Sequence, residues 1–454
     1  MRHAMTPSFT GRPAAAPGTA PPRLAVAGRV STTGKLFIAV MLILIYEGAV
    51  RKWVSNAMST PLIGLRDLLV VFTIGRAFWL GHFARLPLLS RAMLLWTCCV
   101  VGWGLLQLTL GESTFTVFLI GLRFWLLSFW FAVAAAAGMN ERDYVVALRV
   151  LMLALLLMAP LVALQRQAPP ESFINKSLGD DVDEVFQLTA GVVRTTGTFS
   201  FTAGFVTFAA MCAPFALGIF EARKTRPRHR ILAAATFAAL IVCTLVSGAR
   251  ASFLFLGGLL FLYLVGNLAF SPMRQKGRAM IAAVVAICLI GALAFVFSDA
   301  LRTTQERFES AAQTEGIAER LVTTLVGEAS TYDRADWLGA GIGIGSNLAG
   351  FARFSGRAVF TFGETEQGRS LIEGGLLGAL FIVLKLIAIG IGVSVSIRQS
   401  LRTRAIFPVL VWLTLGLALT TWPVIGQLTA HGLIGILLAL GLLTLRYPRL
   451  RFFD

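Results

Sequence analysis

Long apolar segments recur along the whole chain and are separated by shorter polar segments. A helix needs about 20 mostly apolar residues to cross a bilayer, and the hydropathy pattern predicts twelve such helices. They are expected at about residues 36–54, 62–80, 92–110, 114–138, 144–164, 198–222, 231–247, 251–269, 279–298, 371–396, 405–421 and 424–445. No segment of ordinary domain size is left over. The pattern therefore predicts an all-α polytopic membrane protein with about 12 transmembrane helices.

Two of the intervening polar segments are long, at about residues 165–197 and 299–370. Loops of this length without a fold of their own tend to be functional. The second is the large external loop between predicted helices 9 and 10. Residues 1–34 are rich in Ala, Pro, Gly and Thr, which predicts a disordered cytoplasmic tail. Residues 35–454 are expected to form one transmembrane bundle.

The charged residues orient this bundle. Only 14% of the chain is charged, against roughly 25% in soluble domains, yet the net charge is +17. The cations gather in alternate short loops and in the tail: Arg223, Lys224, Arg226, Arg228, Arg230, Arg274, Lys276, Arg278, Arg398, Arg402, Arg404, Arg446, Arg449 and Arg451. This is the positive-inside pattern, so both termini are predicted to be cytoplasmic. The cations would contact membrane lipid headgroups, and nucleic acid is not expected as a partner.

Cysteine, histidine and glycine give no sign of a cofactor. The five cysteines all fall in apolar segments, and the four histidines form no cluster with them, so neither disulfides nor a metal site is expected. The glycine-rich stretch GAGIGIGSN, residues 339–347, follows no strand and therefore does not predict a nucleotide site. We interpret it as a loop that packs closely on a substrate or on the bundle. The acidic stretch GDDVDEVF, residues 179–186, is interpreted as a solvated turn and not as a cation site.

Two pairs of opposite charges lie near the outer ends of the first two predicted helices. Glu47 and Arg51 are four residues apart and share one helix face, and Arg66 directly precedes Asp67. Each pair has two interpretations. It is either a structural ion pair or part of a functional site, because ionisable groups within membrane spans are expensive.

Three further arginines, Arg123, Arg194 and Arg250, have no acid close by in sequence, which favours a functional role. The guanidinium group presents a rigid fork of donors that suits phosphate. Several such groups around a cavity open to lipid would suit an anionic lipid carrier. The motif RTTGTFSF, residues 194–201, adds hydroxyl groups at the predicted start of a helix, where free N–H groups attract anions. The same hydroxyls also suit an ordinary helix cap.

A carboxylate cluster precedes the span predicted at 371–396. Glu364, Glu366 and Arg369 lie just before it, and Glu373 begins it. These carboxylates supply a candidate proton acceptor facing the arginines. Alternatively, Arg369 and Glu373 form a helix-end ion pair without chemistry.

Several of these motifs follow one another in an order that resembles a known protein family. RTTGTFSF precedes a middle helix, SGAR forms an external turn at 247–250, GAGIGIGSN follows, and an E…EGGLLG segment enters the next helix. From about residue 36 onward the chain resembles the O-antigen polymerase/O-antigen ligase superfamily, and YEGAVRKW followed by LRD is similar to its exopolysaccharide-associated branch. The resemblance implies a multi-pass protein of the bacterial inner (cytoplasmic) membrane with a periplasmic active face. The implied donor is an undecaprenyl-diphosphate-linked oligosaccharide, whose diphosphate Arg194 and Arg250 would hold.

The ligases of this superfamily place a histidine in the large loop as the base. This chain has no histidine between His229 and His431, and Glu364 or Glu366 occupies the comparable stretch. That departure favours a polymerase.

The expected reaction is metal-independent, inverting glycosyl transfer to an acceptor glycan during surface polysaccharide or exopolysaccharide assembly. Fixed arginines stabilise the leaving diphosphate, and a carboxylate accepts the acceptor's proton. The catalytic candidates are Arg194, Arg250, Glu364 and Glu366, and the substrate-binding candidates are Arg51, Arg66, Arg123 and Arg369.

Three alternatives stay open. The first is an O-antigen ligase that transfers glycan to a lipid or another acceptor. The second is a transporter or flippase of an anionic lipid-linked substrate, although the two halves of the chain show no repeat of the kind that transporters often carry. The third is a noncatalytic subunit that works with other polysaccharide assembly or export proteins.

Overall fold

The fold was analysed in a computed structural model of the full chain. The structure describes residues 29–176, 187–188, 192–222, 226–270, 290–298, 335–346, 348–349 and 365–453, together with isolated positions between 277 and 334. The acidic turn at 179–186 lies outside the described residues, as do Glu364 and most of the loop expected at 299–370.

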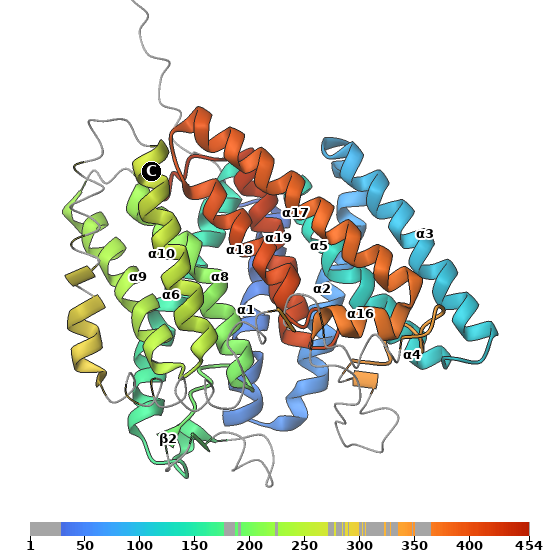
Figure 1. The fold of residues 1–454 in the computed structure, drawn as a ribbon, viewed down its shortest axis with the longest axis horizontal. Helices are drawn as coiled ribbons and strands as arrows, with labels where there is room; N and C mark the ends of the chain where they lie inside the picture. The colour runs from blue at the N-terminus through green and yellow to red at the C-terminus, as the bar shows by residue number, and fades with distance from the viewer. Residues whose placement is uncertain are drawn as a thin grey trace, which may run out of the picture.

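The described chain is a bundle of long helices (Figure 1). In order they are α1 (Thr32–Trp53), α2 (Ser59–Trp79), α3 (Pro87–Thr109), α4 (Phe115–Leu122), the π-helical turn η3 (Arg123–Leu127), α5 (Ser128–Gly138), α6 (Glu141–Gln167), α8 (Thr202–Glu221), α9 (Pro227–Val246), α10 (Arg250–Phe270), α16 (Glu366–Gly374), α17 (Leu376–Thr403), α18 (Phe407–Thr421) and α19 (Leu428–Arg446). Short 3-10 turns stand at Asn56–Met58, His82–Arg85 and Phe173–Asn175, and β1 (Gln187–Leu188) pairs antiparallel with β2 (Val192–Val193).

The predicted all-α polytopic membrane fold is confirmed. Ten helices in the described residues are long and apolar enough to cross a membrane, and α4, η3 and α5 together make one of them. The helix expected at 405–421 is the shorter α18, with 15 residues. The helix expected at 279–298 lies only partly within the described residues, where 290–296 are helical.

The start of α1 is fixed by a buried carboxylate, and the predicted disordered tail is therefore too long. Ser31 caps α1, and the carboxylate of Asp143 accepts hydrogen bonds from the Ser31 backbone N–H at 2.7 Å and from its hydroxyl at 2.6 Å. Asp143 also belongs to the capping box that begins α6, where it accepts from the N–H of Asn140 at 3.0 Å. One carboxylate thus joins the N-terminal ends of α1 and α6, and helix begins at Thr32.

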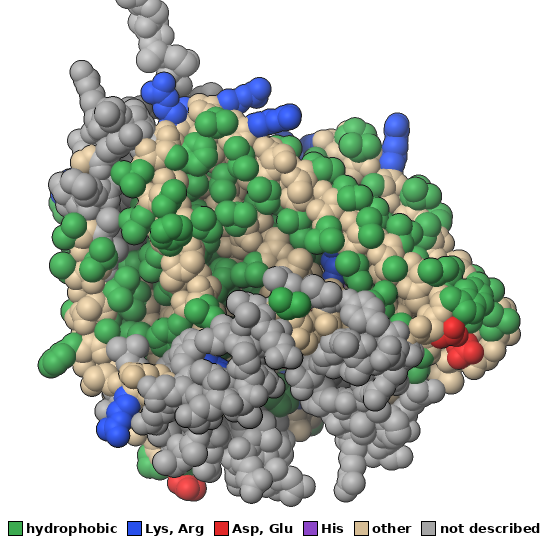
Figure 2. Space-filling view, viewed as in Figure 1, with side chains coloured by type: hydrophobic (Ala, Val, Ile, Leu, Met, Phe, Trp, Pro, Cys, Tyr) green, Lys and Arg blue, Asp and Glu red, His purple; other side chains and the backbone are tan. Residues whose placement is uncertain are grey.

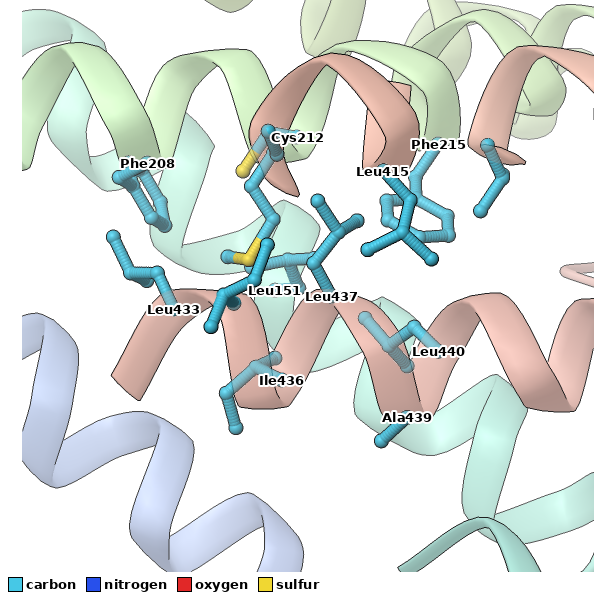
Figure 3. Close-up of a cluster of buried hydrophobic side chains, with 14 of the residues drawn as sticks. Leu151, Phe208, Cys212, Phe215, Leu415, Leu433, Ile436, Leu437, Ala439 and Leu440 are labelled. Carbon is cyan, nitrogen blue, oxygen red and sulfur yellow. The ribbon is translucent and has the colours of Figure 1, made fainter. Parts of the chain in front are cut away.

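The core is built around α19, which is apolar on all sides as expected for a helix surrounded by other helices. Leu433, Ile436, Leu437 and Leu440 of α19 are fully buried. Their neighbours come from α6, α8 and α18, including Leu151, Phe208, Cys212, Phe215 and Leu415 (Figure 3). In contrast, α2, α3, α10 and α17 bury less than a third of their apolar windows, which is expected of helices that face lipid.

The two ends of the bundle differ in charge. One end, which we call the basic end, carries exposed arginines including Arg91, Arg228, Arg402 and Arg449, and Figure 2 shows most of the visible Lys and Arg side chains along its edge, at the top of the view. At the other end α1 stops and α2, α8, α10 and α17 begin. We call this the site end, because the polar motifs of the sequence meet there.

Replacing Asp143 by Ala should lower the stability of the protein by about 3 kcal/mol, because charge-assisted hydrogen bonds to Ser31 and Asn140 are lost in a buried position. Thermal unfolding in detergent would measure the change as a lower Tm. The neighbouring Glu141→Ala is the control, since Glu141 makes only a partly exposed ion pair with Arg451 at 3.6 Å. Equal Tm values for the two variants would contradict the structural role of Asp143.

Candidate functional site

The motifs YEGAVRKW and RTTGTFSF, far apart in sequence, pack directly on each other at the site end. A Cβ at Gly48 of α1 would lie 2.5 Å from the N of Ser200 and the O of Thr198, so only glycine lets the second motif approach. The ammonium group of Lys52, on the last turn of α1, donates to the Thr196 hydroxyl at 2.8 Å and to the Gly197 carbonyl at 2.6 Å.

Other helices hold the same segment. Gln165 at the end of α6 donates to the carbonyl of Gly197 at 3.2 Å and accepts from its N–H at 2.8 Å. The Thr198 hydroxyl donates to the carbonyl of Ile45 in α1 at 2.6 Å. Gly197 has a positive φ of 58°, a conformation that favours glycine. The threonines and Gly197 thus fix the backbone directly after Arg194.

This segment also lies beside the SGAR turn. The Thr195 hydroxyl donates to the carbonyl of Val246, the last residue of α9, at 3.1 Å. Gly248 takes a positive φ of 61° in the turn, and Arg250, half-buried, is the first residue of α10. The structure therefore brings the backbones that carry Arg194 and Arg250 together.

Lys52 and Arg194 lack acidic partners within the described part of the chain. Lys52 is 2% exposed, and its hydrogen-bond partners are the neutral oxygens of Thr196 and Gly197, with the Trp53 ring 4.9 Å away. The buried Nε of Arg194 has no hydrogen-bond partner there, and burial lowers the pKa of this guanidinium. We call Lys52, Arg194, Thr196 and Gly197 the Lys52–Arg194 cluster. Two unneutralised cations and nearby hydroxyls form a setting for an anion.

The two expected charge pairs exist, but they belong to one larger cluster of five side chains. We call Glu47, Arg51, Arg66, Asp67 and Arg123 the ion network. Arg51 lies 3.9 Å from Glu47, and Arg66 lies 3.3 Å from both Glu47 and Asp67. Arg123 binds Asp67 through two bonds, with Nε at 2.6 Å and Nη2 at 3.1 Å.

Arg123, which has no acid close by in sequence, therefore does have an acidic partner in the fold. Its partner Asp67 lies 56 residues away in sequence, which a search for nearby acids does not find. The π-helical turn η3 begins at Arg123 itself. Such turns are rare and frequently mark functional sites.

Glu366 is fully buried and already partnered. Its carboxylate lies 3.4 Å from the ammonium of Lys385 in α17 and accepts from the backbone N–H of Ile425 at 3.1 Å. Burial raises the pKa of Glu366, and the charge of Lys385 opposes that rise. Arg369, also buried, packs so closely on Gly426 that a Cβ there would overlap its guanidinium. This group is part of the packing between α16, α17 and the turn before α19.

Glu373 binds the glycine-rich stretch. Its carboxylate accepts from the Trp125 indole N–H at 2.9 Å, from Gly343 N–H at 2.9 Å and from Gly345 N–H at 3.0 Å. The side-chain amide of Gln107 adds bonds to the carbonyls of Leu338 and Glu373 at 2.7 and 2.9 Å. Described residues 339–346 therefore pack against the bundle.

The entry to α17 also differs from the prediction. Glu373 belongs to the separate short helix α16, and Gly375, with a φ of 52°, breaks the chain before α17 begins at Leu376. The donors to the Glu373 carboxylate are the Trp125 indole and backbone N–H groups, so the alternative pair with Arg369 is not what holds this carboxylate.

Four polar residues with clear roles in this region were missed in the sequence. Lys385 interrupts the apolar run FIVLKLIAIG, which is the signal for an intramembrane ionisable group. Lys52 lies in the motif YEGAVRKW, but it is not among the candidate residues taken from the sequence. Gln107 and Gln165 lie in apolar surroundings, and their roles depend on backbone groups that are remote in sequence.

Among the described residues, no group of His, Cys, Asp and Glu is arranged to hold a metal ion. A scan against known protein families finds no match, and a comparison with curated protein sequences finds none either.

The buried carboxylate of Glu373 should make the stability of the folded protein depend on pH. Burial raises its pKa from 4.5 to about 7, while the bonds from Trp125, Gly343 and Gly345 oppose the rise. Between these two values the folded protein binds more protons than the unfolded chain, so stability should fall as pH rises from about 4.5 to 7. The loss is at most about 3 kcal/mol.

The test compares Tm across this pH range for the wild type and for Glu373→Gln, which cannot ionise and should lack this component. Glu171→Gln, at an exposed carboxylate, is the control and should keep the wild-type slope. The same slope in Glu373→Gln would exclude Glu373 as the titrating group.

Proposed function

We propose that the protein is a membrane glycosyltransferase of the polymerase type. It transfers undecaprenyl-diphosphate-linked oligosaccharide units onto an acceptor glycan during surface polysaccharide assembly. The Lys52–Arg194 cluster, with Arg250 beside it, binds the diphosphate of the lipid donor. The site faces the periplasm of a bacterial inner membrane, and both chain termini are cytoplasmic.

One observation carries this proposal: Lys52, which is buried, and Arg194, which is half-buried, lie at one end of the bundle and form no ion pair within the described residues. An isolated buried cation is unfavourable unless an anion neutralises it. A diphosphate on a long lipid supplies charge in the right place, since its chain can lie along the apolar helices. The order of motifs that resembles the O-antigen polymerase/O-antigen ligase superfamily supports the same ligand.

The proposed step balances without a metal. An acceptor hydroxyl oxygen attacks the anomeric carbon from the face opposite the diphosphate, and a new glycosidic C–O bond forms. The bond from the anomeric carbon to the phosphate oxygen breaks, and its electron pair leaves on undecaprenyl diphosphate. Lys52, Arg194 and Arg250 stabilise that growing negative charge in a site of low dielectric.

The acceptor's proton passes to a carboxylate. Glu364 and Glu366 are the candidates from the sequence. Glu366 is buried, and Lys385 and the Ile425 N–H each bond to one of its oxygens, so an acceptor reaches it only after a local rearrangement.

A substitution at Arg194 tests the proposed diphosphate site. Arg194 makes no hydrogen bond or ion pair within the described part of the chain, so Arg194→Lys removes none there. Lysine cannot reproduce the bidentate fork. Loss of one such contact to the leaving group should cost on the order of 3 kcal/mol, or about a hundredfold in rate. We expect unchanged Tm and almost no polymer when this variant replaces the wild-type gene.

The control is Arg228→Lys, at an exposed arginine of the basic end, which should polymerise normally. Gene deletion completes the test: accumulation of single repeat units indicates a polymerase, and long unattached chains indicate a ligase. Normal polymer from Arg194→Lys, or no glycan change after deletion, would exclude the proposed function.

The orientation can be tested with single cysteines in a variant whose five native cysteines are replaced. A cysteine at Glu171, exposed near the site end, should react with a membrane-impermeant thiol reagent in intact spheroplasts. A cysteine at Arg402, exposed at the basic end, should react only after the membrane is broken. The reverse result would place the site on the cytoplasmic face.

A further inference from the structure

The ion network carries more positive than negative charge. It holds three guanidinium groups against the two carboxylates of Glu47 and Asp67, which leaves an excess of one positive charge when all five groups are ionised. The side chain of Arg66 is only 5% exposed. Arg66 contacts both acids, so the excess charge falls on the partly exposed Arg51, where one more anion can neutralise it.

The network also has spare hydrogen-bond donors. The Nε of Arg51 and the Nη1 of Arg123 are buried and have no hydrogen-bond partner within the described residues. The contact of Arg51 with Glu47, at 3.9 Å, is too long for a hydrogen bond. The side chains of Arg51 and Asp67 are 22% and 25% exposed, so a ligand can reach the network from the site end.

We infer that the ion network binds the carboxylate of an acidic sugar in the transferred glycan, with Arg51 as its main ligand. A carboxylate has one charge, which equals the excess of the network, and its two oxygens match the fork of a guanidinium. A diphosphate, with more charge, is matched better by the Lys52–Arg194 cluster, which contains no acid.

The two anion sites are neighbours. Arg51 and Lys52 are consecutive residues of α1, so their Cα atoms are about 3.8 Å apart. Lys52 turns toward Thr196 and Gly197, whereas Arg51 turns toward Glu47. A single lipid-linked molecule with a diphosphate and an acidic sugar close to it can therefore occupy both. That the ligand is a sugar rests on the proposed function, whereas the need for a monoanion rests on the network alone.

The experiment uses the full-length protein in nanodiscs of phosphatidylcholine, and saturation-transfer NMR with two probes, methyl β-D-glucuronide and methyl β-D-glucoside. The wild type should bind the glucuronide and not the glucoside. Arg51→Gln should weaken glucuronide binding by about tenfold or more, because a charge-assisted contact is lost. Its fold should be kept, since Glu47 retains Arg66. Arg51→Lys, which keeps the charge and loses the fork, should fall between the two.

Arg402→Gln, at an exposed arginine of the basic end, is the matched control and should bind like the wild type. Equal binding of both probes, or wild-type binding by Arg51→Gln, overturns the inference. Loss of glucuronide binding when phosphatidylglycerol is added to the nanodiscs assigns the site to a lipid headgroup and also overturns it. Failure of the proposed function itself would appear separately, as normal polymer from Arg194→Lys with the glucuronide result unchanged.

Discussion

The organisation of the site end follows from the cost of burying cations away from water. A buried guanidinium or ammonium group is tolerated only with acids, neutral acceptors or a bound anion around it. The chain uses different solutions at neighbouring places. Lys385 has Glu366, the ion network has two acids for three arginines, and the Lys52–Arg194 cluster has neutral oxygens alone within the described residues. The proposed anion sites are placed where this compensation by acids is incomplete or absent.

The backbone next to these cations is held in place by many hydrogen bonds. The segment that follows Arg194 bonds to α1, α6 and α9, and Gly48 and Gly197 allow it to approach them. For the proposed glycosyl transfer such a rigid loop is an advantage, because electrostatic stabilisation of a leaving group depends on donors that are in place before the bond breaks. The separate attachment of residues 339–346 to Glu373 and Gln107 gives the site end a second fixed element.

The fold was predictable from the sequence because apolar length alone defines membrane helices. The locations of Glu47, Arg51, Arg66 and Asp67 were predictable too, since they lie near the ends of two apolar helices that follow each other in the sequence. That Arg123 joins these residues into one ion network could not be predicted, because Asp67 and Arg123 are 56 residues apart and only helix packing brings them together. The neutral partners of Lys52 were hidden for the same reason. Gly375 could have suggested the break before α17, but the continuous apolar pattern concealed it.

The account depends most on the affinity of the Lys52–Arg194 cluster for a diphosphate. The direct measurement is the binding of undecaprenyl diphosphate, against uncharged undecaprenol, to the wild type and to Arg194→Gln in nanodiscs of neutral lipid. The account predicts that the wild type binds only the diphosphate and that Arg194→Gln binds it about tenfold or more weakly at an unchanged Tm. Equal binding of the diphosphate by both proteins, or of both lipids by the wild type, would contradict it.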